Sequence, residues 1–272
     1  MKQAIKCTIG CLVGGITRAA SNGPGWLRGL TAFALSRIDN RRRVDTGKGV
    51  ITVHVGAPIE RWRADTLLSK EPETIAWLDR TITPQSVFYD VGANIGLYAL
   101  YAAHLHPGAV KAVCFEPEPM NFARLNQNIA TNRLSDQITA FPLGLGSAAK
   151  ITAFPLSILQ SGGALHGPRM VEDGKAAHVV GLQVCTLDEF RAQAADLPGP
   201  THLKIDVDGP ELEILRGAET TLHDPGTRHL LIELTAADRA QAEQILSAAG
   251  FEESARGPEQ DGMFNVIFEK RS

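Results

Sequence analysis

The sequence predicts an α/β protein built on a doubly wound, mostly parallel sheet. From residue 87 onward, near-continuous apolar runs of strand length alternate with amphipathic segments of helix length. Apolar strands in this alternation are typical of a parallel sheet that helices cover on both faces. The composition is that of an ordinary globular protein, with 44% hydrophobic and 21% charged residues in a chain of 272.

The elements follow one another in a regular order. Six strands are expected at 87–90, 109–116, 137–143, 202–207, 229–234 and 265–270, with another near Phe251. The helices between them are expected at 95–105, 120–131, 187–195, 211–216 and 237–249. The last strand follows a glycine-containing turn instead of a helix, so we expect it to be antiparallel. Residues 144–184 are rich in glycine and predict an insertion over the sheet.

Residues 1–48 differ chemically from the remainder. They hold nine basic and two acidic residues, a local net charge of +7, which leaves −10 for residues 49–272. Apolar residues between Trp26 and Ile38 recur at helical spacing, and Arg41–Arg43 are expected to form a solvated basic turn. Two interpretations stay open: a helix that caps the main domain, or a basic amphipathic arm that contacts a membrane surface or an anionic substrate.

The main domain is therefore expected at 49–272, after an N-terminal arm at 1–48. A strand is expected at 50–55 and a short helix at 72–78, opened by Pro72. The net charge of −3 gives no attraction to nucleic acid. The four cysteines form neither a disulfide framework nor a zinc motif, and no apolar run is long enough to span a bilayer. We expect a soluble, cytoplasmic protein without a transmembrane segment.

The most informative segment joins the first strand of this alternation to the following helix. Asp90 ends the strand, and Gly92, Asn94 and Gly96 form the turn that precedes the helix. In open α/β sheets such a turn lets a ligand approach the backbone beyond the carboxyl ends of the strands. A dinucleotide fingerprint needs glycine at 92, 94 and 97, and positions 94 and 97 are Asn and Leu. The turn therefore does not match a pyrophosphate-binding loop.

The second strand closes on Glu116, which lies 24 residues after Gly92. This spacing is near the ~20 residues expected for the acid that binds a ribose diol. A ribose without a pyrophosphate fits S-adenosylmethionine (SAM). The alternative is that Asp90 is only an acid at a helix N-terminus and Glu116 a surface residue at a turn.

Several motifs in order resemble the FkbM family of SAM-dependent methyltransferases. They are Asp90–Gly96, Phe115–Pro117 with Asn121, Phe122 and Leu125–Asn128 behind it, Leu203–Leu212, and the flanking Lys70–Thr74 and Thr186–Asp188. The resemblance covers roughly residues 70–270. It implies a class I methyltransferase fold, a Rossmann-like seven-stranded sheet in the order 3-2-1-4-5-7-6 whose last strand is antiparallel. It also implies O-methylation of a small molecule or sugar.

Carried over by position, the resemblance implies a cofactor site. Asp90, Gly92, Asn94 and Gly96 would line the methionine end of SAM, and Glu116 would bind its ribose. The adenine would face the region after the third strand, around Leu143 and Gly144.

The catalytic candidates follow the fourth strand. Asp206 ends this strand beside the first one, so it should face the transferred methyl group as a base, directly or through a bound Mg²⁺. Glu211 is the second catalytic candidate. Asp208 and Glu211 also have the spacing of a capping box at the start of a helix, and that alternative stays open. Lys204 shares a strand face with Asp206 and is expected to pair with it.

Three other side chains are secondary candidates. His166 and His178 lie in the insertion, and Glu233 lies near the end of the fifth strand. Each also fits a structural role in a loop or turn, and we assign no metal ligands.

The main interpretation is a SAM-dependent methyltransferase of a small-molecule or sugar acceptor. The alternatives are a non-catalytic module with the same fold and a nicotinamide-dependent oxidoreductase. We expect the insertion and the N-terminal arm to build the acceptor pocket.

Overall fold

The computed structural model of the protein describes residues 24–36, 39–156, 160–163 and 178–270. The chain divides into two compact units, Met1–Asn40 and Arg41–Ser272. In the described part, the first unit contains helix α2 (Gly25–Ser36) and the second contains the predicted sheet. None of the helices in the described ranges has the length and apolarity needed to cross a membrane.

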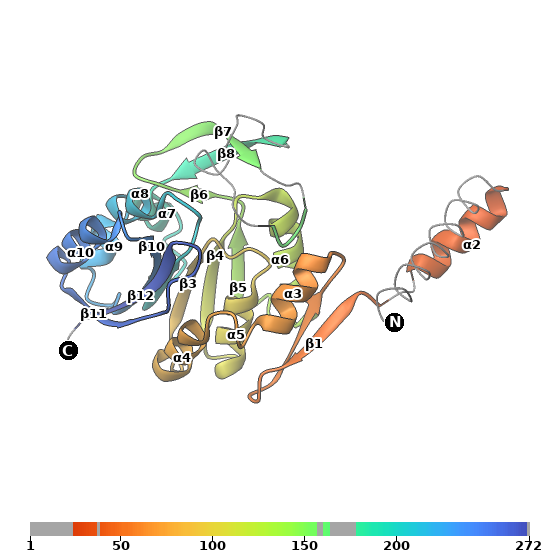
Figure 1. Ribbon diagram of the computed structural model, residues 1–272, viewed down its shortest axis with the longest axis horizontal. Helices are drawn as coiled ribbons and strands as arrows, with labels where there is room; N and C mark the ends of the chain where they lie inside the picture. Colours follow the sequence, from red (N-terminus) through yellow and green to blue (C-terminus); the bar gives the residue numbers. More distant parts are fainter. Residues whose placement is uncertain (1–23, 37–38, 157–159, 164–177, 271–272) are drawn as a thin grey trace. The chain divides into compact units, whose positions relative to one another are not determined.

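The second unit is built on a seven-stranded sheet in the order β11-β12-β10-β9-β3-β4-β5 (Figure 1). When the strands of this sheet are numbered along the chain, with β3 as strand 1, and the sheet is read from its β5 edge, the order is the predicted 3-2-1-4-5-7-6. β12 is antiparallel to β10 and β11, whereas β3 pairs in parallel with β4 and β9. The Rossmann-like fold and its antiparallel last strand are confirmed. The strands are β3 (Val87–Val91), β4 (Lys111–Phe115), β5 (Ile138–Phe141), β9 (His202–Ile205), β10 (His229–Thr235), β11 (Phe251–Arg256) and β12 (Met263–Lys270).

Helices cover both faces of this sheet, because strand residues alternate between two hydrophobic clusters. Phe88 packs in one cluster, and its neighbours Val87 and Tyr89 pack in the other. Most of the helical residues in the first cluster come from α4 (Pro72–Thr81), α5 (Leu97–Leu105) and α6 (Pro119–Thr131). Those of the second are α7 (Leu187–Gln193), α8 (Glu211–Arg216), α9 (Glu219–His223) and α10 (Arg239–Ala248).

A hairpin precedes the sheet, in which β1 (Arg41–Asp45) pairs antiparallel with β2 (Val50–His54). The prediction of a basic turn at Arg41–Arg43 is therefore wrong in conformation, although these side chains are exposed as expected. They form a strand because β2 buries Ile51 and Val53 in the core and offers its edge to β1. The second unit begins at Arg41, so the boundary expected after residue 48 falls inside a chain segment that the hairpin holds together.

Helix α3 (Pro58–Thr66) was not among the predicted elements, although its first turn carries a local signal. Pro58 occupies the first turn, and Glu60 Oε2 accepts a hydrogen bond from the Ala57 N–H at 2.7 Å. Glu60 is fully buried and pairs with Arg124 of α6 at 2.6 Å. This tertiary ion pair, and not an apolar stripe, fixes α3 beside α6, which is why periodicity did not reveal the helix.

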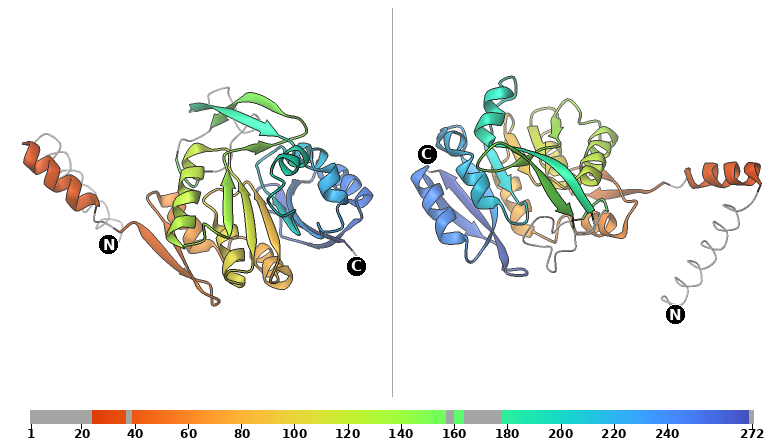
Figure 2. Two further views of the ribbon diagram at one scale, coloured as in Figure 1. Left: turned by 180° about the vertical axis from the view of Figure 1, so that it is seen from behind. Right: turned by 90° about the horizontal axis from the view of Figure 1, so that it is seen from above.

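The glycine-rich segment after β5 contributes a second, three-stranded sheet in the order β6-β8-β7. Its strands are β6 (Gly144–Leu145), β7 (Lys150–Leu156) and β8 (His178–Cys185). Both views from the side show β7 and β8 across one end of the main sheet (Figures 1 and 2). Residues of this small sheet line a cavity together with Gly92 and Phe115, so it covers the carboxyl ends of β3 and β4.

Candidate active site

A polar cavity of about 320 Å³ lies at the carboxyl ends of the central strands. Gly92, Glu116 and Asp206 line it directly after the ends of β3, β4 and β9, and Glu233 lines it from within β10, two residues before that strand ends. Ligands of open α/β sheets bind at this edge. The rest of the wall includes residues of α3, the small sheet and the turn before β12, among them Ile59, Trp62, Arg63, Phe154, Asp261 and Met263.

Glycine is required at the turn after β3 because this turn touches the end of β9. Gly92 has a φ of +84°, and a Cβ built there would lie 1.8 Å from the carbonyl oxygen of Asp206. Leu125 excludes a side chain at Gly96 in the same way, because its Cδ1 would lie 2.3 Å from an added Cβ. Gly92 lines the cavity, whereas Gly96 packs on α6 and is absent from the lining.

The backbone holds the Glu116 carboxylate in place. Its Oε2 accepts the Asn94 N–H at 2.7 Å, and its Oε1 accepts the Glu118 N–H at 2.9 Å. Burial raises the pKa of Glu116 to about 7, and the N–H groups of Glu118 and Asn94 oppose this shift. Glu116 is buried in the cavity wall and is not the surface residue of the alternative interpretation. Each carboxylate oxygen keeps acceptor capacity for a further donor.

A second, more apolar cavity of about 250 Å³ adjoins the first. The two share Gly92, Pro117 and Val207 among their lining residues. Gly144, predicted on the adenine side, lines the second cavity and not the first. The apolar part of its wall comes from Phe115, Leu143, Leu145, Leu182 and Val184. A polar chamber and an apolar chamber thus meet at the Gly92 turn.

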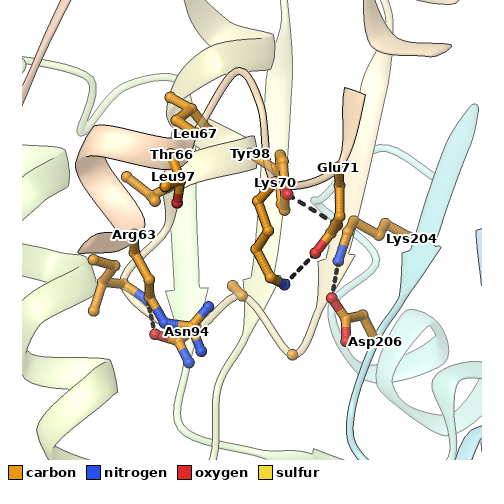
Figure 3. Close-up of a pocket in the computed structure, with 13 residues that line it drawn as sticks. Arg63, Thr66, Leu67, Lys70, Glu71, Asn94, Leu97, Tyr98, Lys204 and Asp206 are labelled. Carbon is orange, nitrogen blue, oxygen red and sulfur yellow. Dashed lines mark hydrogen bonds and ion pairs between the residues drawn. The ribbon is translucent and has the colours of Figure 1, made fainter. Parts of the chain in front are cut away.

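Beside the polar cavity, a buried ion pair confirms the expected contact between Lys204 and Asp206 (Figure 3). Lys204 Nζ donates to Asp206 Oδ2 at 2.6 Å and lies 4.9 Å from the centroid of the Tyr98 ring. The Lys204 side chain is 1% exposed and that of Asp206 is 24% exposed. Glu71 lies next to this pair and accepts a hydrogen bond from the Tyr98 hydroxyl at 2.9 Å.

Charge determines the protonation of this pair. Burial alone lowers the pKa of Lys204, but the carboxylates of Asp206, Asp90 and Glu71 outweigh burial and hold that pKa above its usual value. Burial alone raises the pKa of Asp206, but Lys204 outweighs it and holds that pKa below its usual value. Asp206 is therefore a fixed negative charge and a weak base.

Glu233 has the opposite character, although it lines the same cavity. Burial, and then the negative charge of Asp206, raise the pKa of Glu233 to about 8. Leu231, two residues earlier on β10, packs in the cluster that contains α5 and α6, so Glu233 shares the strand face of Leu231. The cavity therefore pairs an ionised carboxylate with one that titrates near neutral pH.

Besides Gly96, two predicted site residues lie away from the cavity lining. Asp90 is 1% exposed and neighbours Lys204 across the β3–β9 pair. Burial raises the pKa of Asp90 to about 6 against the opposing effect of Lys204. Glu211 is buried at the start of α8, where its Oε1 accepts the Gly209 N–H at 2.9 Å. Neither of them contributes to the wall of either cavity.

The capping-box interpretation of this turn is wrong in its geometry. Pro210, and not Asp208, occupies the N-cap position of α8. Asp208 has a φ of +59°, in the left-handed region, and it lines the polar cavity. The backbone reverses sharply through Gly209, which keeps Asp208 on the cavity side while Glu211 turns inward.

Sequence reasoning missed the cationic side of the site. Arg63 of α3 and Lys70 both line the polar cavity, and Lys70 pairs with Glu71. Arg63 Nε donates to the Gly162 carbonyl at 2.6 Å. The Lys70–Thr74 motif entered the sequence prediction only through the family resemblance, and α3 was not predicted.

Of the secondary candidates, His178 is exposed on β8 and His166 lies outside the described residues. The described residues contain no group of three or more His, Cys, Asp or Glu side chains arranged to hold a metal ion.

Strand order, glycine turn and buried acid at the second strand together define the class as a Rossmann-like methyltransferase. The chain belongs to the FkbM methyltransferase family, because the family model described as Methyltransferase FkbM domain matches residues 90–253. The protein is therefore a methyltransferase enzyme. Family membership supports this interpretation over a nicotinamide-dependent oxidoreductase.

Named relatives agree with this assignment. The chain is 29% identical over 210 residues to the 31-O-demethyl-FK506 methyltransferase FkbM of Streptomyces tacrolimicus, covering 67% of this chain and 78% of the relative. It is 27% identical over 191 residues to the hexuronic acid methyltransferase AglP of Haloferax volcanii, covering 70% and 73% respectively. A solved structure of an FkbM methyltransferase from Methylobacillus flagellatus is 17% identical, with a TM-score of 0.48 over 89% of this chain and 59% of that one.

Proposed function

We propose that the protein transfers a methyl group from SAM to a hydroxyl of a small molecule or sugar. The observation that carries the proposal is the meeting of two cavities at the Gly92 turn, one lined by many charged side chains and the other by few, with the buried Glu116 in the wall of the first. SAM has the same division into parts: an apolar adenine, a ribose diol and a charged methionine end. A pyrophosphate would need further glycines in this turn, and the chain has Asn94 and Leu97 instead.

The chemistry of the lining residues fits each part of SAM. Glu116 is the acceptor for the ribose hydroxyls, because a carboxylate accepts two of them at once. The apolar chamber beside Gly144 takes the adenine. Asp206 provides a fixed negative charge for the sulfonium end, and Arg63 and Lys70 provide the positive charge that a methionine carboxylate requires.

SAM, when bound, supplies an activated methyl group for in-line displacement by the acceptor oxygen. This chain must align the acceptor and remove its proton. Glu233 is better suited than Asp206 to take that proton, because its pKa of about 8 lies near the working pH whereas Lys204 keeps Asp206 a weak base. We therefore assign proton removal to Glu233, a positioning role to Asp206, and no step to a metal ion.

The acceptor class is supported by two observations. The relatives named above carry names that specify hexuronic acid and 31-O-demethyl-FK506 as their methyl acceptors. The polar cavity also offers what a hydroxylated acceptor needs. Glu233 and Asp208 accept hydrogen bonds, and Trp62, which is 47% exposed, provides an aromatic wall.

Calorimetry with SAM and with NADH tests the cofactor, and mass spectrometry of products tests transfer. We expect SAM to bind and to raise Tm by mass action, whereas NADH does neither. Uronic acids, neutral sugars and polyketide alcohols then serve as acceptors with methyl-labelled SAM. A Tm shift with NADH and none with SAM would overturn the proposal, and SAM binding without any transfer would favour the non-catalytic module.

A further inference from the structure

Helix α2 presents an apolar face to solvent. Trp26, Leu30 and Phe33 recur at steps of four and three residues, so they share one side of the helix. Their exposed fractions are 67%, 57% and 59%. An exposed apolar stripe of this kind on a soluble protein marks a surface that binds something.

The charged residues of the sequence that flanks this stripe have one sign. The chain contains no Asp or Glu before Asp39, and it carries five basic residues over the same stretch: Lys2, Lys6, Arg18, Arg28 and Arg37. α2 itself contains one basic residue, Arg28, which is exposed. A ligand for this segment must therefore be anionic as well as apolar.

We propose that α2 is an interfacial helix that binds an anionic membrane surface. Trp26, Leu30 and Phe33 enter the boundary between headgroups and acyl chains, and the basic residues attract the acidic headgroups. Each signal alone gives weak, reversible binding, and the two together hold the protein at the surface. The helix has 12 residues, so it lies along the surface and does not cross the bilayer.

Charge and apolarity together favour this partner over two others. A second copy of the chain would bring an equally basic segment against the first, and like charges repel. A nucleic acid would satisfy the charge, but its phosphates offer no apolar surface for the Trp26, Leu30 and Phe33 side chains. An anionic lipid surface satisfies both requirements.

The test is flotation of the full chain with lipid vesicles. We expect binding to vesicles of phosphatidylcholine with phosphatidylserine, at least tenfold weaker binding to phosphatidylcholine alone, and weakening by salt. The variant Leu30→Glu places a charge in the stripe and should reduce binding to the mixed vesicles at least tenfold. The control Thr31→Glu makes a substitution of the same charge one position along, on another side of α2, and should keep most of the binding.

Other results would overturn the proposal. Equal loss in Leu30→Glu and Thr31→Glu would show that only net charge matters. Sedimentation of the wild type as a dimer that Leu30→Glu dissociates, without vesicle binding, would identify a second copy as the partner. A lowered Tm of Leu30→Glu without vesicle binding would show that another part of the chain covers the stripe. SAM binding, measured on each variant, reports separately on the catalytic unit.

Discussion

The two halves of the active site are built by different means. At the ends of β3 and β4, backbone groups form most of the contacts. Gly92 packs against the carbonyl of Asp206, and two backbone N–H groups hold the Glu116 carboxylate. At the ends of β9 and β10, side chains from distant elements set the charge, with Lys204 between Asp206 and Glu71. The first half rests on two sequence motifs and on the close approach of Gly92 to the end of β9. The second depends on packing, and its chemistry changes when a single partner changes.

The largest expected effect is loss of the buried cation on the side-chain half. Lys204→Met leaves Asp206, Asp90 and Glu71 without their shared counter-charge, which should cost about 3–5 kcal/mol of unfolding free energy. Denaturant unfolding at neutral pH measures it. Lys111→Met, at an exposed lysine on β4, is the control and should change stability by less than about 0.5 kcal/mol. Equal stability of the two variants would mean that Lys204 does not organise this half.

The next largest expected effect is on turnover, where substitutions of Glu233 and of Asp206 should have different consequences. Glu233→Gln should lower kcat by about 10²-fold and remove the rise of kcat/KM with pH, which in the wild type should follow the Glu233 pKa of about 8. Asp206→Asn should keep this rise with pH and weaken SAM binding instead. The opposite pattern, in which Asp206→Asn abolishes the rise and Glu233→Gln keeps it, would return the base role to Asp206. Steady-state kinetics as a function of pH, with SAM and the acceptor found in the screen, measures kcat and kcat/KM of both variants.

The backbone half is tested at Glu116. Glu116→Ala removes the acceptor of two ribose hydroxyls, each charge-assisted bond being worth about 1.5–3 kcal/mol, so SAM affinity should fall at least tenfold. Calorimetry measures it, and Glu219→Ala on α9, outside both cavities, is the control. Unchanged affinity in a folded Glu116→Ala protein would move the ribose site away from the end of β4.

The last expected effect concerns stability instead of activity, and it is the pH dependence of unfolding set by Glu233. The folded-state pKa of about 8 is raised above the unfolded value of ~4.3, so the protonated carboxyl stabilises the fold. That stability is fully present below the unfolded pKa and is lost as pH rises through about 8. Glu233→Gln cannot ionise, so its Tm should gain on the wild type by roughly 10 °C between about pH 4 and pH 9. A Tm difference independent of pH would contradict a buried, titrating Glu233.

Much of the fold and half of the site could be predicted, because both rest on short-range regularities. The alternation of apolar strands with amphipathic helices predicted the doubly wound sheet and its antiparallel last strand, and the resemblance to the FkbM family implied the strand order. Gly92, Asn94 and Glu116 belong to two motifs whose spacing is set by one strand, one turn and one helix. By contrast, α3 and the strand at Arg41–Arg43 escaped notice, because a buried ion pair with Arg124 and the edge of β2 hold them.

The sequence by itself determined the alternation of strands and helices, the glycine turn and the acid that closes β4, because hydrophobic period and turn chemistry are properties of neighbouring residues. The strand order followed from the resemblance to the FkbM family. Only the tertiary structure decided which carboxylates are charged. Asp206 and Glu233 lie 27 positions apart in the sequence and look alike there, but one lies beside Lys204 and the other beside Asp206 itself. Burial and the nearest charge set a pKa, and both are settled by residues that the chain brings together from far apart.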